Sequence, residues 1–337
     1  MGAATLRRMF KRFRPDEIRR AVLSSYALDL NKSFDSLVYV AGTRRSGTTW
    51  LAELINARNE HRMIFEPFHD RWGPFPETLV ERYARPTMAY PELRSRVEQI
   101  LLGKFRHAWS GRHNTKLIST KRLIKDIHTN LMLKWFRSEF PPFPIVLIIR
   151  HPCAVAQSNL RVQFDAELEI YLQQDELRFD YLLPFVGPIE AAETEFERLI
   201  FQWCIENYVP LRQFQDSEEI HVVLYESLVL RPAEELERLC TYLGKRFDDS
   251  ILAAVERPSS TTWRAPREQL AQTRDAAFAW RGSVARDQIA RSEEILTLFG
   301  LDGLYSSDGS PQTTGQLTLP NLGHERPGVS SEPLRGA

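Results

Sequence analysis

The stretch that most constrains the fold of this chain runs from residue 37 to residue 55, LVYVAGTRRSGTTWLAELI. Its apolar beginning, residues 37–41, predicts a strand, and the helical spacing of apolar residues after the turn predicts a helix. The first N–H groups of such a helix lack backbone partners and, with the helix dipole, attract an anion. Gly42 and Gly47 let the turn curve closely around that anion. The sequence therefore predicts a turn that binds phosphate or sulfate.

This turn has the glycine spacing of a Walker loop but lacks its lysine. Thr48 stands where the Walker lysine would reach the phosphates of a nucleotide, and the cation comes earlier, at Arg44 or Arg45. Residues 45–51, RSGTTWL, resemble the 5′-phosphosulfate loop of sulfotransferases, whose pattern reads [KR]-S-G-T-T-W-L. The alternative is a strand-to-helix turn with threonine caps and no ligand.

A second motif follows the strongest strand signal, at residues 144–149. Arg150 ends that strand and Ser158 follows eight residues later, in RHPCAVAQSNL. Sulfotransferases hold the 3′-phosphate of 3′-phosphoadenosine 5′-phosphosulfate (PAPS) with an Arg and a Ser at this spacing. An arginine fork grips phosphate through two hydrogen bonds and a serine hydroxyl adds a donor. A third segment, residues 223–232, resembles the late strand-to-helix segment of the same family, where Tyr225 and Glu226 are expected to orient the site.

The resemblance implies further contacts with PAPS. Trp50 occupies the position whose indole stacks on adenine, although a core helix tryptophan is the alternative. Arg281-Gly282 would close a loop over the nucleotide. The residues expected to bind PAPS are Arg44, Arg45, Ser46, Gly47, Thr48, Thr49, Trp50, Arg150, Ser158, Arg281 and Gly282.

For the general base, the resemblance to tyrosylprotein and carbohydrate sulfotransferases points to Glu66, in the sequence FEP after a predicted strand at residues 62–65. A crowded, partly dry pocket is expected to raise its pKa, and nearby Arg45 to oppose that rise. The alternative is a carboxylate that only holds Arg44 or Arg45 in place. His69 is the reserve base, because small-molecule enzymes of the family use a histidine.

The resemblance also implies a second cation, because many sulfotransferases carry a lysine after the third strand that reaches the bridging oxygen of the phosphosulfate. Here the third strand is predicted at residues 116–120. Lys121 is favoured there over Lys116 and Lys125, and with Glu66 and Arg45 it completes the predicted catalytic set. No cluster of metal-ligating residues stands out in the sequence, so no metal is expected.

Strands alternate with helices along the chain, which predicts an α/β fold: a three-layer, P-loop-like arrangement with a mainly parallel sheet and helices on both faces. In such sheets ligands bind at the carboxyl ends of the strands, so the loops after residues 41, 65, 119, 149 and 224 should line one crevice. We predict a basic N-terminal helical segment (1–35), a sulfotransferase domain (36–305) with an acidic insertion (163–200), and a disordered tail (306–337).

Composition narrows the function classes. The formal net charge of zero over 337 residues argues against general nucleic-acid binding. No signal peptide is recognisable, and the cysteines at 153, 204 and 240 are read as reduced thiols, which favours a cytoplasmic protein. Residues 1–20 carry seven basic side chains with Met9, Phe10 and Phe13 between them. This pattern is typical of a basic amphipathic helix at a membrane surface, and the alternative is a helix exposed to solvent.

These features together predict a PAPS-dependent O-sulfotransferase that works by in-line transfer. The expected acceptor is a hydroxyl on a carbohydrate or glycoconjugate, with glycolipids and small molecules left open. Two alternatives remain: a P-loop kinase-like phosphotransferase, and a non-catalytic nucleotide-binding protein.

Overall fold

The computed structural model describes residues 26–69, 81–257, 259–260 and 274–312. The predicted basic helix within residues 1–25 and most of the predicted tail, residues 313–337, lie outside these ranges. Within them, no helix is both long and apolar enough to cross a membrane.

The centre of the fold is a five-stranded sheet whose neighbouring strands all run parallel. From one edge to the other its strands are β3 (Arg62–Phe65), β5 (Arg122–Lys125), β2 (Leu37–Gly42), β6 (Ile145–Ile149) and β7 (His221–Leu224). Because every strand points the same way, the loops after all five strands meet at one edge of the sheet. The predicted parallel α/β sheet is confirmed.

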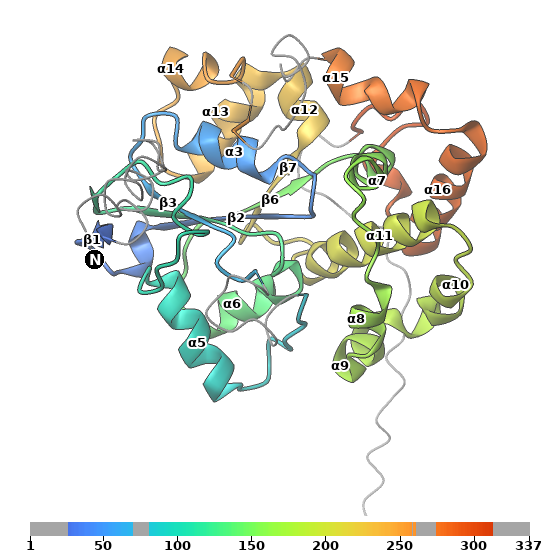
Figure 1. The fold of residues 1–337 in the computed structure, drawn as a ribbon, viewed down its shortest axis with the longest axis horizontal. Coiled ribbons are helices and arrows are strands. Elements are labelled where there is room, and N and C mark those ends of the chain that lie inside the picture. Colours follow the sequence, from blue (N-terminus) through green and yellow to red (C-terminus); the bar gives the residue numbers. More distant parts are fainter. Residues whose placement is uncertain (1–25, 70–80, 258, 261–273, 313–337) are drawn as a thin grey trace, which may run out of the picture.

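Helices cover both faces of this sheet (Figure 1). Strand residues alternate between the two faces. In β2, Tyr39 belongs to one apolar core and Val40 to the other, and in β6 Leu147 and Ile148 divide in the same way. The predicted three-layer arrangement is therefore confirmed.

The helices of the first face are α5 (Pro91–Leu101), α6 (Leu133–Glu139), α7 (Pro152–Arg161), α11 (Glu195–Gln213) and α16 (Arg286–Phe299). Those of the second face are α3 (Thr48–Ile55), α12 (Tyr225–Leu230), α13 (Pro232–Tyr242), α14 (Asp249–Leu252) and α15 (Arg274–Phe278). The acidic insertion folds into α8 (Leu168–Leu172), α9 (Asp175–Leu177) and α10 (Val186–Glu190), beside α11 in Figure 1.

Local sequence signals explain where several of these helices begin and end. α11 starts with a capping box, in which Thr194 accepts a hydrogen bond from the Glu197 N–H and the Glu197 side chain accepts one in return. α16 ends at Gly300, whose φ of 66° allows the left-handed turn that closes a helix.

The prediction for residues 116–136 was wrong. The expected strand at 116–120 contributes only β4 (Ile118–Ser119), which pairs with β1 (Leu28–Asp29) in a separate two-stranded sheet. The apolar spacing of Ile127, Leu131 and Trp135 predicts a helix over residues 123–136, but this segment begins instead as β5, a strand of the central sheet. Charged residues at both ends of β5 make its sequence unlike that of a buried strand. Arg122 is nevertheless fully buried, because its guanidinium donates to the carbonyl groups of Leu101, Asn31 and Ser33.

Candidate active site

The turn after β2 can be formed only with glycine at two positions. Gly47 has φ of 97°, and a Cβ there would lie 2.8 Å from the ring of Tyr225. At Gly42 a Cβ would lie 2.6 Å from the carbonyl oxygen of Ile148 in β6. The turn therefore runs tightly between β6 and α12, where any side chain at these positions would collide.

The turn presents the N-terminus of α3 to the crevice. Gly47 is the N-cap residue and supplies no side-chain hydrogen bond, so no capping group competes for the first N–H groups. Thr48 and Thr49 follow in the first turn and are buried. The hydroxyl of Ser46 donates to the Thr43 carbonyl at 2.7 Å and thereby holds the turn closed. An uncapped helix start after a tight turn is a suitable anion site.

Two predicted phosphate-binding residues from distant parts of the chain meet beside this turn. The Nε of Arg45 donates to the hydroxyl of Ser158 on α7 at 2.9 Å. Arg150, at the end of β6, donates from Nη1 to the Arg45 carbonyl at 3.4 Å, and its guanidinium lies 4.4 Å from the centre of the Tyr225 ring. The structure thus brings together Arg45, Arg150 and Ser158, as the sequence motifs predicted.

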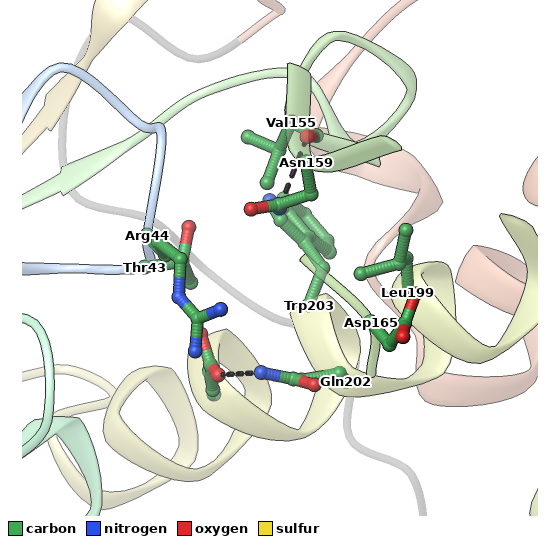
Figure 2. Close-up of a pocket in the computed structure, with 9 residues that line it drawn as sticks. Thr43, Arg44, Val155, Asn159, Asp165, Leu199, Gln202 and Trp203 are labelled. Carbon is green, nitrogen blue, oxygen red and sulfur yellow. Dashed lines mark hydrogen bonds between the residues drawn. The ribbon is translucent and has the colours of Figure 1, made fainter. Parts of the chain in front are cut away.

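Arg44 is directed elsewhere. Its guanidinium lies 3.8 Å from the carboxylate of Glu167 and 4.8 Å from the centre of the Phe164 ring, both in the acidic insertion. In Figure 2, Arg44 and Thr43 lie on one side of a small cavity and Gln202 of α11 lies on the other. The cavity has a volume of about 10 Å³, room for one water molecule. We expected Arg44 to bind PAPS, but here it ties the turn to the insertion.

The third motif orients the end of β6. Glu226 is fully buried and accepts hydrogen bonds from the His151 N–H at 3.0 Å and from the Tyr305 hydroxyl at 3.1 Å. Burial raises the pKa of Glu226, and the charge of Arg150 opposes that rise. This geometry gives Glu226 a supporting place behind Arg150, as expected from the sequence.

Trp50 lies in the core. Its side chain is 1% exposed and meets Tyr225 edge to face, with 5.4 Å between ring centres. Neither face of the indole is open to a ligand in this arrangement, so the placement corresponds to the alternative of a core tryptophan rather than to stacking on adenine.

Arg281 and Gly282 end a short 3₁₀ helix, η6 (Ala279–Gly282), that packs against α7, the helix carrying Ser158. The next residue, Ser283, accepts a hydrogen bond from the side chain of Gln157 on α7. The Arg281 guanidinium lies 4.0 Å from the Phe278 ring centre and 3.9 Å from Asp308. The predicted closing pair therefore lies beside α7, on the same side of the crevice as Ser158.

Glu66 and Lys125 form a buried ion pair at the carboxyl ends of β3 and β5. Their side chains are 9% and 3% exposed. The Glu66 N–H donates to the Lys125 carbonyl at 2.7 Å, and the backbone of Glu66 is left-handed, with φ of 40°. Since β5 lies between β3 and β2, Lys125 stands between Glu66 and the anion-binding turn.

The direction of the Glu66 pKa corrects our expectation. Burial acts to raise this pKa, but the charge of Lys125 and its hydrogen bond, helped by His128 and His69, hold it below its ordinary value. The sequence suggested Arg45 as the cation that opposes the effect of burial on the Glu66 pKa. In the structure that cation is Lys125.

Lys121 is not brought to this site. It precedes β5, so it lies at the amino end of the sheet, where its side chain is 52% exposed and 3.5 Å from Glu60. Lys116 is there too, donating to the Asn59 carbonyl at 3.0 Å. Of the three lysines considered, only Lys125 lies at the carboxyl edge. The misplaced strand boundary explains the error.

Sequence reasoning also missed His128, three residues after Lys125. Its Nδ1 lies 3.3 Å from a carboxylate oxygen of Glu81, and its buried Nε2 has no hydrogen-bond partner among the described residues. Its ring centre is 5.3 Å from that of His69. The signal was available as KDIH, a lysine and a histidine directly after a strand, but it was hidden by assigning these residues to a helix.

Glu66, His69 and His128 together could hold a metal ion. One ligand atom of each lies within 4.8 Å of the others. Two imidazoles and one carboxylate suit a transition metal. Glu66 is, however, paired with the Lys125 ammonium, which competes with any cation for this carboxylate.

Behind the turn lies a buried acidic group centred on Glu81 and Glu206. Glu206 accepts hydrogen bonds from the Tyr171 hydroxyl and the Gln202 amide, each at 2.7 Å. Burial is the largest cause that raises the pKa of Glu81 and of Glu206 to about 8, and the charge of Arg44 opposes it in both. Burial therefore favours the neutral form of both carboxyl groups.

Comparisons with known proteins place this geometry in a family. The profile of the Sulfotransferase domain family matches residues 35–263. No curated protein matches the chain. Among solved structures, the chain is similar to a sulfotransferase domain from the curacin biosynthetic pathway, with 14% identity and a TM-score of 0.44, covering 80% of this chain and 99% of that one.

Two further structures are similar at the same level. Mouse sulfotransferase SULT7A1 complexed with PAP has 14% identity and a TM-score of 0.42, covering 83% of this chain and 87% of that one. Retinol dehydratase in a complex with retinol and PAP has 17% identity and a TM-score of 0.41, covering 85% and 86%. Because the family profile spans more than half of the sequence, the chain belongs to the sulfotransferase family.

Proposed function

We propose that this sulfotransferase moves the sulfuryl group of PAPS to a hydroxyl of a carbohydrate or glycoconjugate, with Glu66 as general base and Lys125 as the cation beside it. The observation that carries this proposal is the buried Glu66–Lys125 pair at the same sheet edge as the anion-binding turn.

The residues of the donor site suit the two charged ends of PAPS. The uncapped start of α3 and the exposed Arg45 suit the phosphosulfate. Arg150 and Ser158 suit the 3′-phosphate. The guanidinium supplies only hydrogen-bond donors, and the hydroxyl supplies a donor that can rotate toward a phosphate oxygen. Arg45 and Ser158 already bond each other, so binding PAPS would replace that bond by bonds to phosphate oxygens.

In the proposed reaction, an acceptor oxygen forms a bond to sulfur as the bond between sulfur and the 5′-phosphate oxygen breaks. The hydroxyl proton passes to the Glu66 carboxylate, and adenosine 3′,5′-bisphosphate leaves. Lys125 is suited to neutralise charge on the departing oxygen. When Lys125 turns from Glu66 toward that oxygen, the largest opposition to burial is lost, so the pKa of Glu66 rises as the proton arrives.

Polar groups around Glu66 support a carbohydrate acceptor. His69 and His128 lie beside Glu66, and Glu81 lies behind His128. Such groups can form hydrogen bonds with several sugar hydroxyls at once. The FEP sequence, with its resemblance to carbohydrate sulfotransferases, favours the same acceptor class.

Nucleotide preference tests the donor half of the proposal. We expect adenosine 3′,5′-bisphosphate to raise the thermal unfolding midpoint and Mg·ATP to leave it unchanged. Arg45→Ala should weaken bisphosphate binding about tenfold to a hundredfold, as expected for a charged hydrogen bond to phosphate. Arg161→Ala, which removes an exposed arginine at the end of α7, is the matched control. A preference for Mg·ATP would favour a kinase instead.

An acceptor screen tests the other half. Sulfur-labelled PAPS is incubated with the protein and separate pools of simple glycosides, lipid-linked sugars, phenols and sterols. We expect label in the glycoside or lipid-linked pool. Label only in phenols or sterols would refute the acceptor class while leaving the donor intact, and no label in any pool, despite bisphosphate binding, would favour a non-catalytic nucleotide-binding protein.

A further inference from the structure

The turns after β3 and β5 bring three metal-binding side chains together at the carboxyl edge of the sheet. One ligand atom of each of Glu66, His69 and His128 lies within 4.8 Å of the others. Glu66 and His128 are 7% and 6% exposed, so this cluster is largely shielded from water. Zinc bonds of about 2.0–2.2 Å hold tetrahedral ligand atoms roughly 3.3–3.6 Å apart. Small rotations of the three side chains would therefore close the cluster around an ion.

A buried carboxylate fixes the two turns relative to each other. Asp126 accepts a hydrogen bond from the His128 N–H at 2.7 Å through Oδ1, and one from the Phe68 N–H at 3.2 Å through Oδ2. Within the turn after β3, the His69 N–H donates to the Glu66 carbonyl at 3.3 Å. The backbone therefore holds the three side chains near one another before any ligand binds.

The surroundings of His128 are those of a metal ligand. Its Nδ1 lies 3.3 Å from a carboxylate oxygen of Glu81, and its buried Nε2 has no hydrogen-bond partner in the part of the chain that the structure describes. Metal-bound histidines usually direct their second ring nitrogen to a carboxylate or carbonyl group in this way. A buried polar atom without a partner costs free energy, and a bound ion would remove that cost.

Lys125 opposes a metal ion at this place because its ammonium is paired with Glu66. Binding of an ion to Glu66 must therefore displace the ammonium. The Lys125 Nζ also lies 4.6 Å from the centre of the Phe65 ring, a cation–π contact that can hold the ammonium after Glu66 has turned to the ion. Only an ion that binds imidazole well can compete, which disfavours Mg²⁺ and Ca²⁺ because they prefer oxygen ligands.

We propose that Glu66, His69 and His128 form an inhibitory Zn²⁺ site. Zn²⁺ suits two imidazoles and one carboxylate, and it imposes no geometry of its own on them. Inhibition follows because a carboxylate bound to Zn²⁺ cannot take the proton of the acceptor hydroxyl. The binding of the ion is argued from the geometry, whereas the inhibition rests on the proposed function, in which Glu66 is the base.

Metal titration of the full chain tests the site without measuring activity. Calorimetry with Zn²⁺, and visible absorption with Co²⁺ as its spectroscopic substitute, should show one tightly bound ion per chain. His69→Gln and His128→Gln should each weaken binding about a hundredfold, at least as much as the loss of a ligand's hydrogen-bond partner does. His221→Gln is the matched control and should bind as the wild type does, because His221 lies in β7 at the opposite edge of the sheet.

Lys125→Met is the sharpest variant because the proposal predicts a gain of affinity. Removal of the competing ammonium should strengthen Zn²⁺ binding about tenfold, measured at a temperature at which the variant is folded. Three results would overturn the site: no Zn²⁺ binding by the folded wild type, binding that both glutamine variants at 69 and 128 leave unchanged, or weaker binding by Lys125→Met.

The rate of sulfuryl transfer tests the inhibition separately. Zn²⁺ should lower the wild-type rate at the concentrations that fill the site, and a chelator should restore it. Binding at this site without inhibition would refute the inhibitory role and would count against Glu66 as the base. Absence of the metal site would refute this inference alone and leave the proposed function as it stands.

Discussion

Replacing Lys125 by methionine separates the structural assignment of the second cation from the sequence-based one. Methionine keeps much of the length and volume of the lysine side chain but removes its charge. Glu66 would then stay buried without its ion-pair partner. Lys121→Met is the matched control, because Lys121 is half exposed and pairs with Glu60 on the surface at 3.5 Å.

The expected magnitudes differ because the two pairs differ in burial. Removing one partner of a buried pair lowers the free energy of unfolding by about 3–5 kcal/mol, since it leaves an uncompensated charge. Part of this cost is relieved if Glu66 takes up a proton, since burial alone favours its neutral form. Loss of an exposed pair costs about 0.2–1 kcal/mol.

Urea unfolding at neutral pH and the rate of sulfuryl transfer are the two assays. We expect Lys125→Met to lower both the unfolding free energy and the transfer rate, the latter about a hundredfold or more, as when a group that stabilises transition-state charge is lost. Lys121→Met should change neither measurably. Similar losses in the two variants, or a larger loss in Lys121→Met, would refute the assignment of Lys125.

Three further outcomes are expected. Gly47→Ala should weaken binding of adenosine 3′,5′-bisphosphate and lower the free energy of unfolding in urea by about 1–3 kcal/mol, because φ at Gly47 is 97° and Tyr225 occupies the space of the Cβ. Gly187→Ala is the control, and because the space around Gly187 is open it should be neutral or slightly stabilising. The pKa of Glu206 rises from 4.5 to about 8 on folding, so the folded form binds more protons between these pH values than the unfolded form does. The free energy of unfolding should therefore fall as pH rises through this window, and Glu206→Gln should flatten that dependence. An unchanged slope in the variant would contradict this prediction. Trp50→Ala should lower the unfolding free energy by about 3–5 kcal/mol, while nucleotide affinity of the remaining folded protein changes little; a large affinity loss in the milder Trp50→Phe would restore the adenine-stacking role.

The donor side of the site could be predicted from the sequence because its signals are local. Gly42 to Leu51 form one continuous turn and helix start, and Arg150 directly ends an apolar β-branched run that is recognisable as a buried parallel strand. Parallel strands then bring such strand ends to one edge, so the meeting of Arg45 with Ser158 followed from topology.

The acceptor side could not be predicted as well because its strand is short and charged. β5 reads RLIK, and the burial of Arg122 and Lys125 depends on distant partners, the carbonyl groups upstream and Glu66. Strand propensity, read from the local sequence, does not detect such distant partners. The shifted strand boundary then led to Lys121 and hid His128. Likewise, the direction of Arg44 depends on Glu167 in the insertion, which no local pattern relates to the turn.

The rate of labelled sulfuryl transfer by Glu66→Gln, measured against the wild type with PAPS and the best acceptor of the screen, tests the central claim most directly. Glutamine keeps the shape of the side chain and removes its capacity to take the proton. The account predicts a rate lower by about 10²–10⁴-fold with unchanged affinity for adenosine 3′,5′-bisphosphate. A rate within about twofold of the wild type, from a protein that binds the nucleotide normally, would show that Glu66 is not the base.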